Sequence, residues 1–110
     1  DKGKYSLSFV TFESKLKNIE YPTFYFDLTL EQYELVKDND ADIKLKLGFV
    51  DATENKFGEY FVNGDINYFD TKSASYEKDI SELVVKGKNS VKLKPKKTLE
   101  VRELRVDLVK

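Results

Sequence analysis

The chain has 110 residues, 40% of them hydrophobic and 35% charged, which predicts one globular domain and excludes an intrinsically disordered segment. Its 19 basic and 20 acidic side chains give a net charge of −1, which provides no general attraction to nucleic acid, and no apolar run approaches the roughly 18 residues of a membrane span. The absence of cysteine and histidine excludes disulfides, thiol nucleophiles and imidazole bases, so we expect a protein that is not an enzyme.

Apolar and polar side chains alternate along most of the chain, and this period of two indicates strands. The predicted strands are residues 5–13, 24–30, 43–49, 58–62, 65–69, 76–80, 90–94 and 99–109. The first strand is extended and apolar, and a polar stretch separates it from the second. Residues 1–13 could therefore also act as an arm that donates a strand to a neighbouring molecule.

A short helix is predicted over residues 30–37, because Thr29 and Gln32 have the spacing of a capping box. Three aspartates follow it at alternate positions, Asp38, Asp40 and Asp42. This spacing is that of the start of a calcium loop, so calcium is the one cofactor the sequence suggests. The alternative is a solvated turn between the helix and the next strand.

The dipeptide Asn63-Gly64 predicts a two-residue hairpin turn, because both positions need positive φ. Residues 81–85 are expected to form a second helical turn that Gly87 ends. In the last strand the apolar phase slips by one residue at Arg102-Glu103, which predicts a β-bulge there.

About eight strands, two short helical turns and no linker predict a single all-β domain over residues 1–110. The matching architecture is a two-sheet antiparallel β-sandwich of the jelly-roll type.

Residues 60–93 carry a more specific pattern. Residues 60–64 run from a strand into the Asn-Gly turn, and residues 76–91 read Tyr-Glu-Lys-Asp-Ile-Ser-Glu-Leu-Val-Val-Lys-Gly-Lys-Asn-Ser-Val. This cadence resembles that of galactose-binding-domain-like jelly rolls, a group that includes many non-catalytic carbohydrate-binding modules. The resemblance implies a jelly roll and, as one alternative, a glycan-binding module of a secreted glycosidase-type protein. Its ligand platform would be formed by Tyr25, Tyr60, Tyr68 and Tyr76.

The leading functional hypothesis is a non-catalytic extracellular structural or adhesive subunit that self-associates head to tail by strand addition. The hypothesis uses the apolar first strand, a hairpin that looks apolar on both faces, and a basic edge within residues 86–97. Charge also differs along the chain, with ten acids and five bases in residues 38–79 and nine bases and three acids in residues 86–110. The candidate contact residues are Tyr5, Leu7, Phe9, Val10, Phe12, Phe61, Phe69, Lys86 and Lys94.

The expected partners are therefore further copies of the chain or a glycan, with no nucleic acid and no membrane insertion. An extracellular or cell-surface location is expected, because the chain starts at Asp1 as a cleaved signal peptide or an excised module would leave it. The absence of methionine and cysteine beside many lysines and glutamates is typical of heat-adapted proteins.

Overall fold

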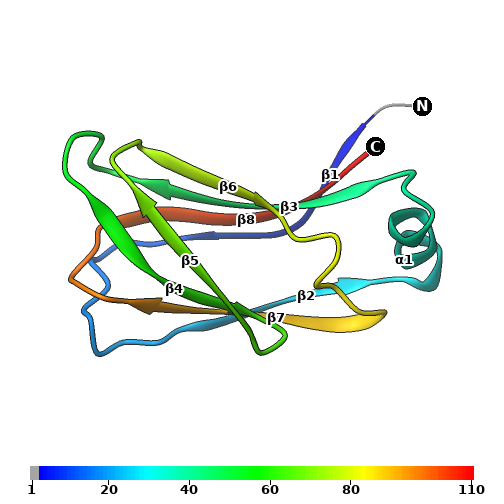
Figure 1. The fold of residues 1–110 in the computed structure, drawn as a ribbon, viewed down its shortest axis with the longest axis horizontal. Coiled ribbons are helices and arrows are strands. Elements are labelled where there is room, and N and C mark those ends of the chain that lie inside the picture. The colour runs from blue at the N-terminus through cyan, green and yellow to red at the C-terminus, as the bar shows by residue number, and fades with distance from the viewer. Residues whose placement is uncertain (1–2) are drawn as a thin grey trace.

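The computed structural model describes residues 3–110. It contains eight strands and one helix: β1 (Lys4–Thr11), β2 (Thr23–Leu28), α1 (Leu30–Lys37), β3 (Asp42–Phe49), β4 (Lys56–Val62), β5 (Asp65–Thr71), β6 (Ser75–Asp79), β7 (Gly87–Pro95) and β8 (Val101–Val109). The strands form two antiparallel layers packed face to face, with α1 across one end (Figure 1). No helix among these residues is both long and apolar enough to span a membrane.

The strand order shows how the chain is wound. The first sheet has the order β1-β8-β3-β6 and the second has the order β2-β7-β4-β5. The antiparallel pairs β1·β8, β2·β7, β3·β6 and β4·β5 are therefore nested, as if one long hairpin had been folded over. This is the double-sheet arrangement of a jelly roll, and the predicted two-sheet sandwich is confirmed.

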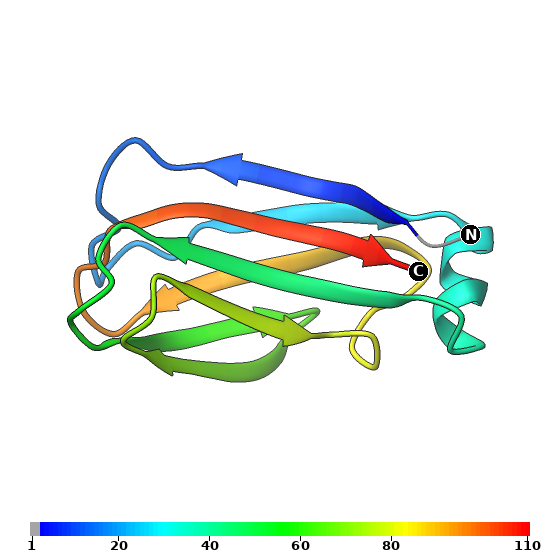
Figure 2. The same ribbon diagram turned by 90° about the horizontal axis from the view of Figure 1, so that it is seen from above.

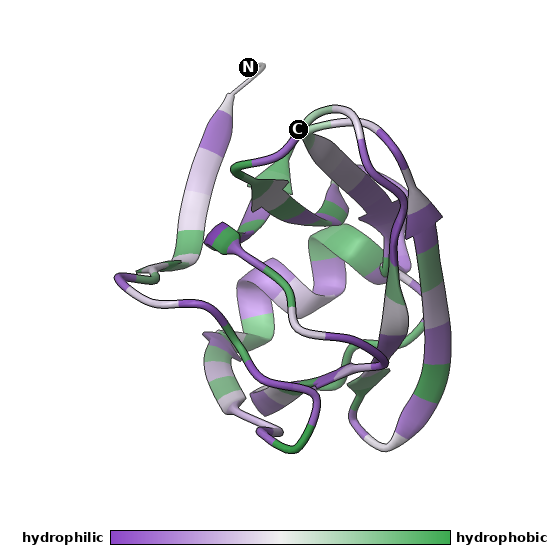
Figure 3. Cartoon of the chain, turned by 90° about the vertical axis from the view of Figure 1, so that its left-hand side faces the viewer, coloured by the Kyte–Doolittle hydropathy of each residue, from purple (hydrophilic) through white to green (hydrophobic). Residues whose placement is uncertain are grey.

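Both sheets contribute to the core between the layers. Alternate side chains along each strand point inward, as the period of two requires. The fully buried side chains of the strands include Ile43, Leu45, Leu47, Tyr60, Val62, Val91, Leu104 and Val106. Seen along the strands, hydrophobic and hydrophilic residues alternate along the cartoon and α1 lies at the far end of the sandwich (Figure 3).

The helix α1 has the predicted bounds and the predicted cap. Thr29 Oγ1 accepts the backbone N–H of Gln32 at 3.1 Å, and Gln32 Oε1 accepts the backbone N–H of Thr29 at 2.9 Å. Val36 is the buried residue of the helix. After the helix, Asn39 adopts a φ of 63° and the chain turns toward β3. The helix therefore acts as a plug for one end of the sandwich.

Two other local predictions are confirmed. Asn63 and Gly64 have φ values of 52° and 88°, as the two-residue turn requires. In β8, Glu103 pairs with Gly48 and Val101 with Phe49, so Arg102 is the extra residue of a bulge.

The predicted helical turn at residues 81–85 is wrong. This segment is a turn held by two asparagine side chains, one from the turn between β4 and β5 and one from β7. Asn89 Oδ1 accepts the backbone N–H of Val85 at 2.7 Å, and Asn63 Nδ2 donates to the carbonyl of Leu83 at 2.9 Å. Apart from the backbone hydrogen bond from Leu83 N–H to the carbonyl of Ile80 at 2.9 Å, these side-chain contacts take the place of helical hydrogen bonds.

Candidate functional site

The outer face of the first sheet is occupied by charges that neutralise one another. Asp107 is buried on this face, with Lys4 Nζ at 3.7 Å and Arg105 Nε at 3.5 Å from its Oδ2 atom. Lys44 Nζ lies 3.5 Å from Asp79 Oδ2 on the neighbouring strands. We assign this surface no ligand, because its buried carboxylate, Asp107, already forms ion pairs with Lys4 and Arg105.

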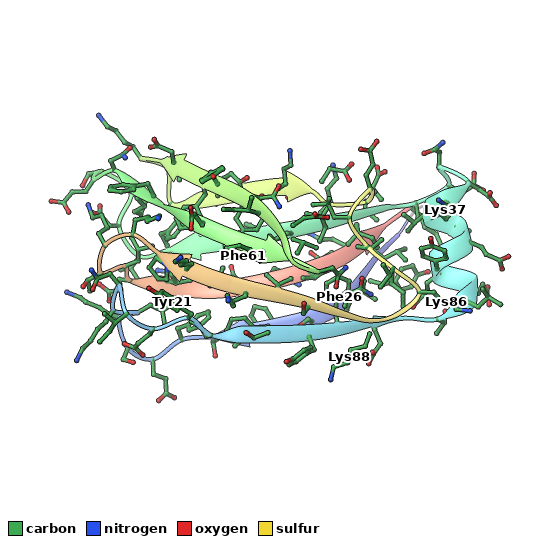
Figure 4. All side chains as sticks on the ribbon, turned by 60° about the horizontal axis from the view of Figure 1, so that its bottom comes forward. Tyr21, Phe26, Lys37, Phe61, Lys86 and Lys88 are labelled. Atoms are coloured by element: carbon green, nitrogen blue, oxygen red, sulfur yellow. The ribbon has the colours of Figure 1, made fainter. Side chains whose placement is uncertain are left out.

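The outer face of the second sheet combines lysines with aromatic rings. The central strand β7 presents Lys88, Lys92 and Lys94 on this side, and the strands beside it supply the rings. Four of these rings each have a lysine Nζ within 6 Å, at 4.2 Å for Lys88 over Tyr25, 5.2 Å for Lys92 over Phe61, 5.5 Å for Lys94 over Tyr21 and 5.7 Å for Lys97 over Phe57. Figure 4 brings this sheet forward, with Tyr21, Phe61 and Lys88 labelled.

These lysines differ in their partners. Glu59 is buried between strands and has Lys94 Nζ at 3.8 Å and Lys96 Nζ at 3.5 Å. Lys88 and Lys92 have no carboxylate within 4.0 Å among residues 3–110, and their ammonium groups rest on the rings instead. Cation–π contacts of this kind hold long side chains flat over apolar surface.

The structure does not assemble the predicted tyrosine platform. Tyr60 is 0% exposed, and its hydroxyl lies 2.7 Å from that of Tyr76 inside the sandwich. Burial, followed by the hydrogen bond with Tyr76, raises the pKa of Tyr60. Of the four predicted tyrosines, only Tyr25 and Tyr68 lie on the outer face of the second sheet, so the platform of four is a wrong prediction.

Several predicted contact residues are also placed differently from expectation. Phe69 is 4% exposed, because the two-residue turn pairs Val62 with Asp65 and so turns Phe69 inward beside Gly58. Leu7 and Phe12 pack against the core, and Val10 is half-buried. Phe61 does face outward. Tyr5 and Phe9 are the contact residues of β1 that stay largely exposed.

The basic segment is not an edge of the sandwich. Strand β7 lies between β2 and β4, and β8 lies between β1 and β3. The acidic and basic parts of the sequence are therefore interleaved within the same sheets. Lys86 lies beside α1, whereas Lys94 lies on the outer face, so the predicted basic edge is wrong (Figure 4).

Strand β1 pairs with β8 of its own sheet and forms one edge of the sandwich (Figure 2). No strand among residues 3–110 lies along its other side, and residues 1–2 of the predicted arm lie outside the described residues. The strand contains a single charge, Lys4, and its main protection is a bulge between Ser6 and Ser8. By contrast, β6 has five residues, three of them charged. The edge of β1 is thus the more open end of its sheet.

The aspartates proposed for calcium surround the end of α1. Asp38 ends the helix, and its N–H donates to Glu34. Among residues 3–110, no three or more acidic, histidine or cysteine side chains converge to hold a metal ion. We therefore develop no calcium site from Asp38, Asp40 and Asp42.

Asp79 helps to form the turn beside this region. Its Oδ1 atom accepts the backbone N–H of Ser81 at 2.9 Å, and Ser81 Oγ accepts that of Ile43 at 2.9 Å. Burial alone would raise the pKa of Asp79, but the hydrogen bonds from Ser81 and the charge of Lys44 outweigh it and lower the pKa.

The Asp79→Asn variant should lose stability at pH 7 but not near pH 2. A carboxyl group whose pKa is lower in the folded chain stabilises it above the unfolded pKa of roughly 3.9, and this contribution disappears as the pH falls through the folded pKa. The midpoint of urea unfolding, measured from pH 7 to pH 2, tests this. Equal losses at both ends of the range would contradict it, and Asp40→Asn is the exposed control.

At the end of the sandwich opposite α1, the buried residue Lys56 lies in the wall of a hollow of about 280 Å³. Its Nζ atom donates to the carbonyls of Asp51 at 2.7 Å, Glu54 at 2.8 Å and Lys72 at 3.0 Å. An ammonium group has three donors, so all of them are used. Lys56 therefore ties three carbonyls of two loops together and has no proton or lone pair free for catalysis.

Comparisons with known protein families, curated proteins and solved structures found no match to this chain. The resemblance of residues 60–93 to galactose-binding-domain-like modules stays a prediction.

Proposed function

We propose that the protein is a non-catalytic structural subunit that self-associates head to tail by strand addition. The observation that supports this is the open edge of β1, an eight-residue strand with one charge and two exposed aromatic rings, Tyr5 and Phe9. Unpaired backbone groups on such an edge are a template for another strand. An extracellular location belongs to the proposal, because a chain without cysteine or methionine has no sulfur to oxidise.

The partner edge in this proposal is β6 of a second copy. Strands β1 and β6 are the two edges of one sheet, separated by three antiparallel steps, so they run in opposite directions. A copy displaced sideways would present β6 antiparallel to β1. Because the contact joins two different surfaces, it does not close on itself and can continue from copy to copy.

The hydrogen bonds identify which N–H groups are available on each edge. Phe12 donates to Arg102 and Lys110 donates to Gly3 within the β1·β8 ladder, at 3.0 and 2.8 Å. Since bonded and non-bonded pairs alternate along antiparallel strands, the N–H of Ser6 points away from β8. Similarly, Ile80 donates to Ile43, which places the N–H of Glu77 on the open side of β6.

Proline at these positions removes an edge donor and spares the ladder, so the fold should survive. We expect wild-type protein to form concentration-dependent oligomers in sedimentation velocity, and both Ser6→Pro and Glu77→Pro to reduce them to monomers. The matched control is Asp27→Pro on β2. Its N–H faces outward by the same rule, because Leu93 donates to Pro22.

A wild-type chain that stays monomeric at high concentration would refute self-association. Oligomers that survive both proline variants would place the contact elsewhere. If the oligomers disappear with Ser6→Pro but persist with Glu77→Pro, β1 pairs with β1 of a second copy in a closed dimer. This result would overturn the head-to-tail arrangement.

A further inference from the structure

The turn between β4 and β5 contains the dipeptide of the chain that is most prone to deamidation. Among the six asparagines of the sequence, only Asn63 precedes a glycine. Because glycine has no side chain to obstruct the approach, its backbone nitrogen can attack the side-chain carbonyl carbon of the asparagine before it. Gly64 is exposed, and nothing lies within 4 Å of the place where a side chain would stand. The sequence and the exposure of Gly64 therefore mark Asn63 as a site of spontaneous chemical change.

The reaction needs only the chain and water. The nitrogen of Gly64 forms a bond to Cγ of Asn63, the bond from Cγ to Nδ2 breaks, and the proton of the Gly64 nitrogen leaves with Nδ2 as ammonia. Water then opens the succinimide ring at one of its two carbonyl carbons and gives aspartate or isoaspartate. One water is consumed and one ammonia is released, so a neutral amide becomes an acid without any change of oxidation state.

The folded chain holds the side chain of Asn63 by both ends of its amide. Nδ2 donates to the carbonyl of Leu83 and to Oδ1 of Asn89, both at 2.9 Å. Oδ1 accepts the backbone N–H of Ser90, also at 2.9 Å. An amide nitrogen has two hydrogens to donate, and both are used here. Since Nδ2 must lose both hydrogen bonds before it can leave as ammonia, deamidation requires local opening of this turn.

The product of the reaction cannot restore the lost contacts. A carboxylate has no hydrogen to donate, so at this position it would face the carbonyl of Leu83 and Oδ1 of Asn89 as another acceptor. Asn89 cannot relieve this contact by turning its amide over, because its Oδ1 atom also accepts the backbone N–H of Val85 at 2.7 Å. Deamidation therefore removes a hydrogen bond that holds residues 81–85, and refolding does not bring it back.

We propose that Asn63 is a latent deamidation site that the folded chain protects through its hydrogen bonds with Leu83, Asn89 and Ser90. Modification is slow while these hydrogen bonds persist. Once an opening lasts long enough for the ring to close, the turn at residues 81–85 is loosened irreversibly. The site lies apart from β1 and β6, so this inference does not depend on self-association.

The first test measures the rate of deamidation at mildly alkaline pH by mass spectrometry of the peptide that contains Asn63. We expect the folded wild-type chain to react at least roughly tenfold more slowly than the same chain unfolded in urea, because only its open state reacts. Equal rates would overturn the proposal, and this comparison needs no variant.

The second test removes one of the protecting contacts. Asn89→Ala should recover much of the difference between the folded and unfolded rates, with its fold checked by circular dichroism. Asn67→Ala is the matched control, because that side chain makes one exposed hydrogen bond, to the carbonyl of Asp65, and its loss should leave the rate unchanged. If a folded Asn89→Ala chain reacts no faster than Asn67→Ala, Asn89 does not protect the site.

The third test examines the consequence with Asn63→Asp, which imitates one product. We expect a lower midpoint of urea unfolding at pH 7 and faster hydrogen exchange at residues 81–85. Relative to wild type at the same pH, the loss should be smaller near pH 2, where the new carboxyl group is protonated and can donate one hydrogen bond. Asn67→Asp makes the same chemical change in the same hairpin and should have little effect. A midpoint for Asn63→Asp equal to that of wild type at pH 7 would refute the loosening of the turn.

Discussion

Replacing Asn89 by alanine should lower the free energy of unfolding by about 4 kcal/mol. The side chain is 0% exposed, and both of its polar atoms are fully used. Oδ1 accepts from Val85 N at 2.7 Å and from Asn63 Nδ2 at 2.9 Å, while Nδ2 donates to the carbonyls of Val85 at 2.9 Å and Gly87 at 3.0 Å. Alanine removes four hydrogen bonds made by a fully buried side chain and offers their partners no replacement.

The loss of stability should appear as a lower midpoint of urea unfolding with an unchanged slope, when unfolding is monitored by far-ultraviolet circular dichroism. Asn67→Ala is the matched control, because that amide makes a single exposed hydrogen bond to the carbonyl of Asp65. Its loss should be below about 1 kcal/mol. If the two variants lose similar stability, the Asn89 hydrogen bonds do not hold the turn between β6 and β7.

The second large effect is expected for Lys56→Met, which should cost about 3 kcal/mol. Methionine keeps much of the length of the side chain but cannot donate, so the carbonyls of Asp51, Glu54 and Lys72 lose a shared charged donor. Since these carbonyls belong to the two loops that close this end of the sandwich, both loops should loosen. Faster hydrogen exchange at residues 50–55 and 72–74 would show this directly.

Lys97→Met provides the comparison, because Lys97 Nζ makes one hydrogen bond, to the carbonyl of Asn55 at 2.9 Å. Lys97→Met should lower the free energy of unfolding by less than about 1.5 kcal/mol. Faster hydrogen exchange should be confined to the first of the two loops. A Lys56→Met chain as stable as the wild type would mean that water replaces the ammonium group without cost.

The features that were predictable from the sequence are those decided by neighbouring residues. The cap of α1 depends on Thr29 and Gln32, the hairpin on Asn63-Gly64, and the bulge on a phase slip at Arg102. The inward position of Phe69 was also available in principle. A two-residue turn after Val62 places every second residue from Asp65 on the inner face, but the apolar character of Ile66 and Tyr68 suggested the opposite face.

The candidate sites could not be predicted in this way, because each joins residues from different strands. The Lys88 contact with Tyr25 depends on β7 lying beside β2, and the Lys92 contact with Phe61 depends on β7 lying beside β4. The sequence places Lys56 at the end of a polar loop, residues 51–56, ahead of the predicted strand 58–62. Its burial follows from two loops folding over it, which no local pattern in the sequence records.

The nested strand pairs differ in the length of chain that lies between their two strands and must be closed when they pair. Two residues connect β4 to β5, whereas almost the entire chain separates β1 from β8. Because the entropic penalty of closing a loop grows with its length, the hairpin is the natural nucleus and the pairing of the two terminal strands comes last. The strand whose edge is open is therefore also the one whose pairing closes the longest stretch of chain.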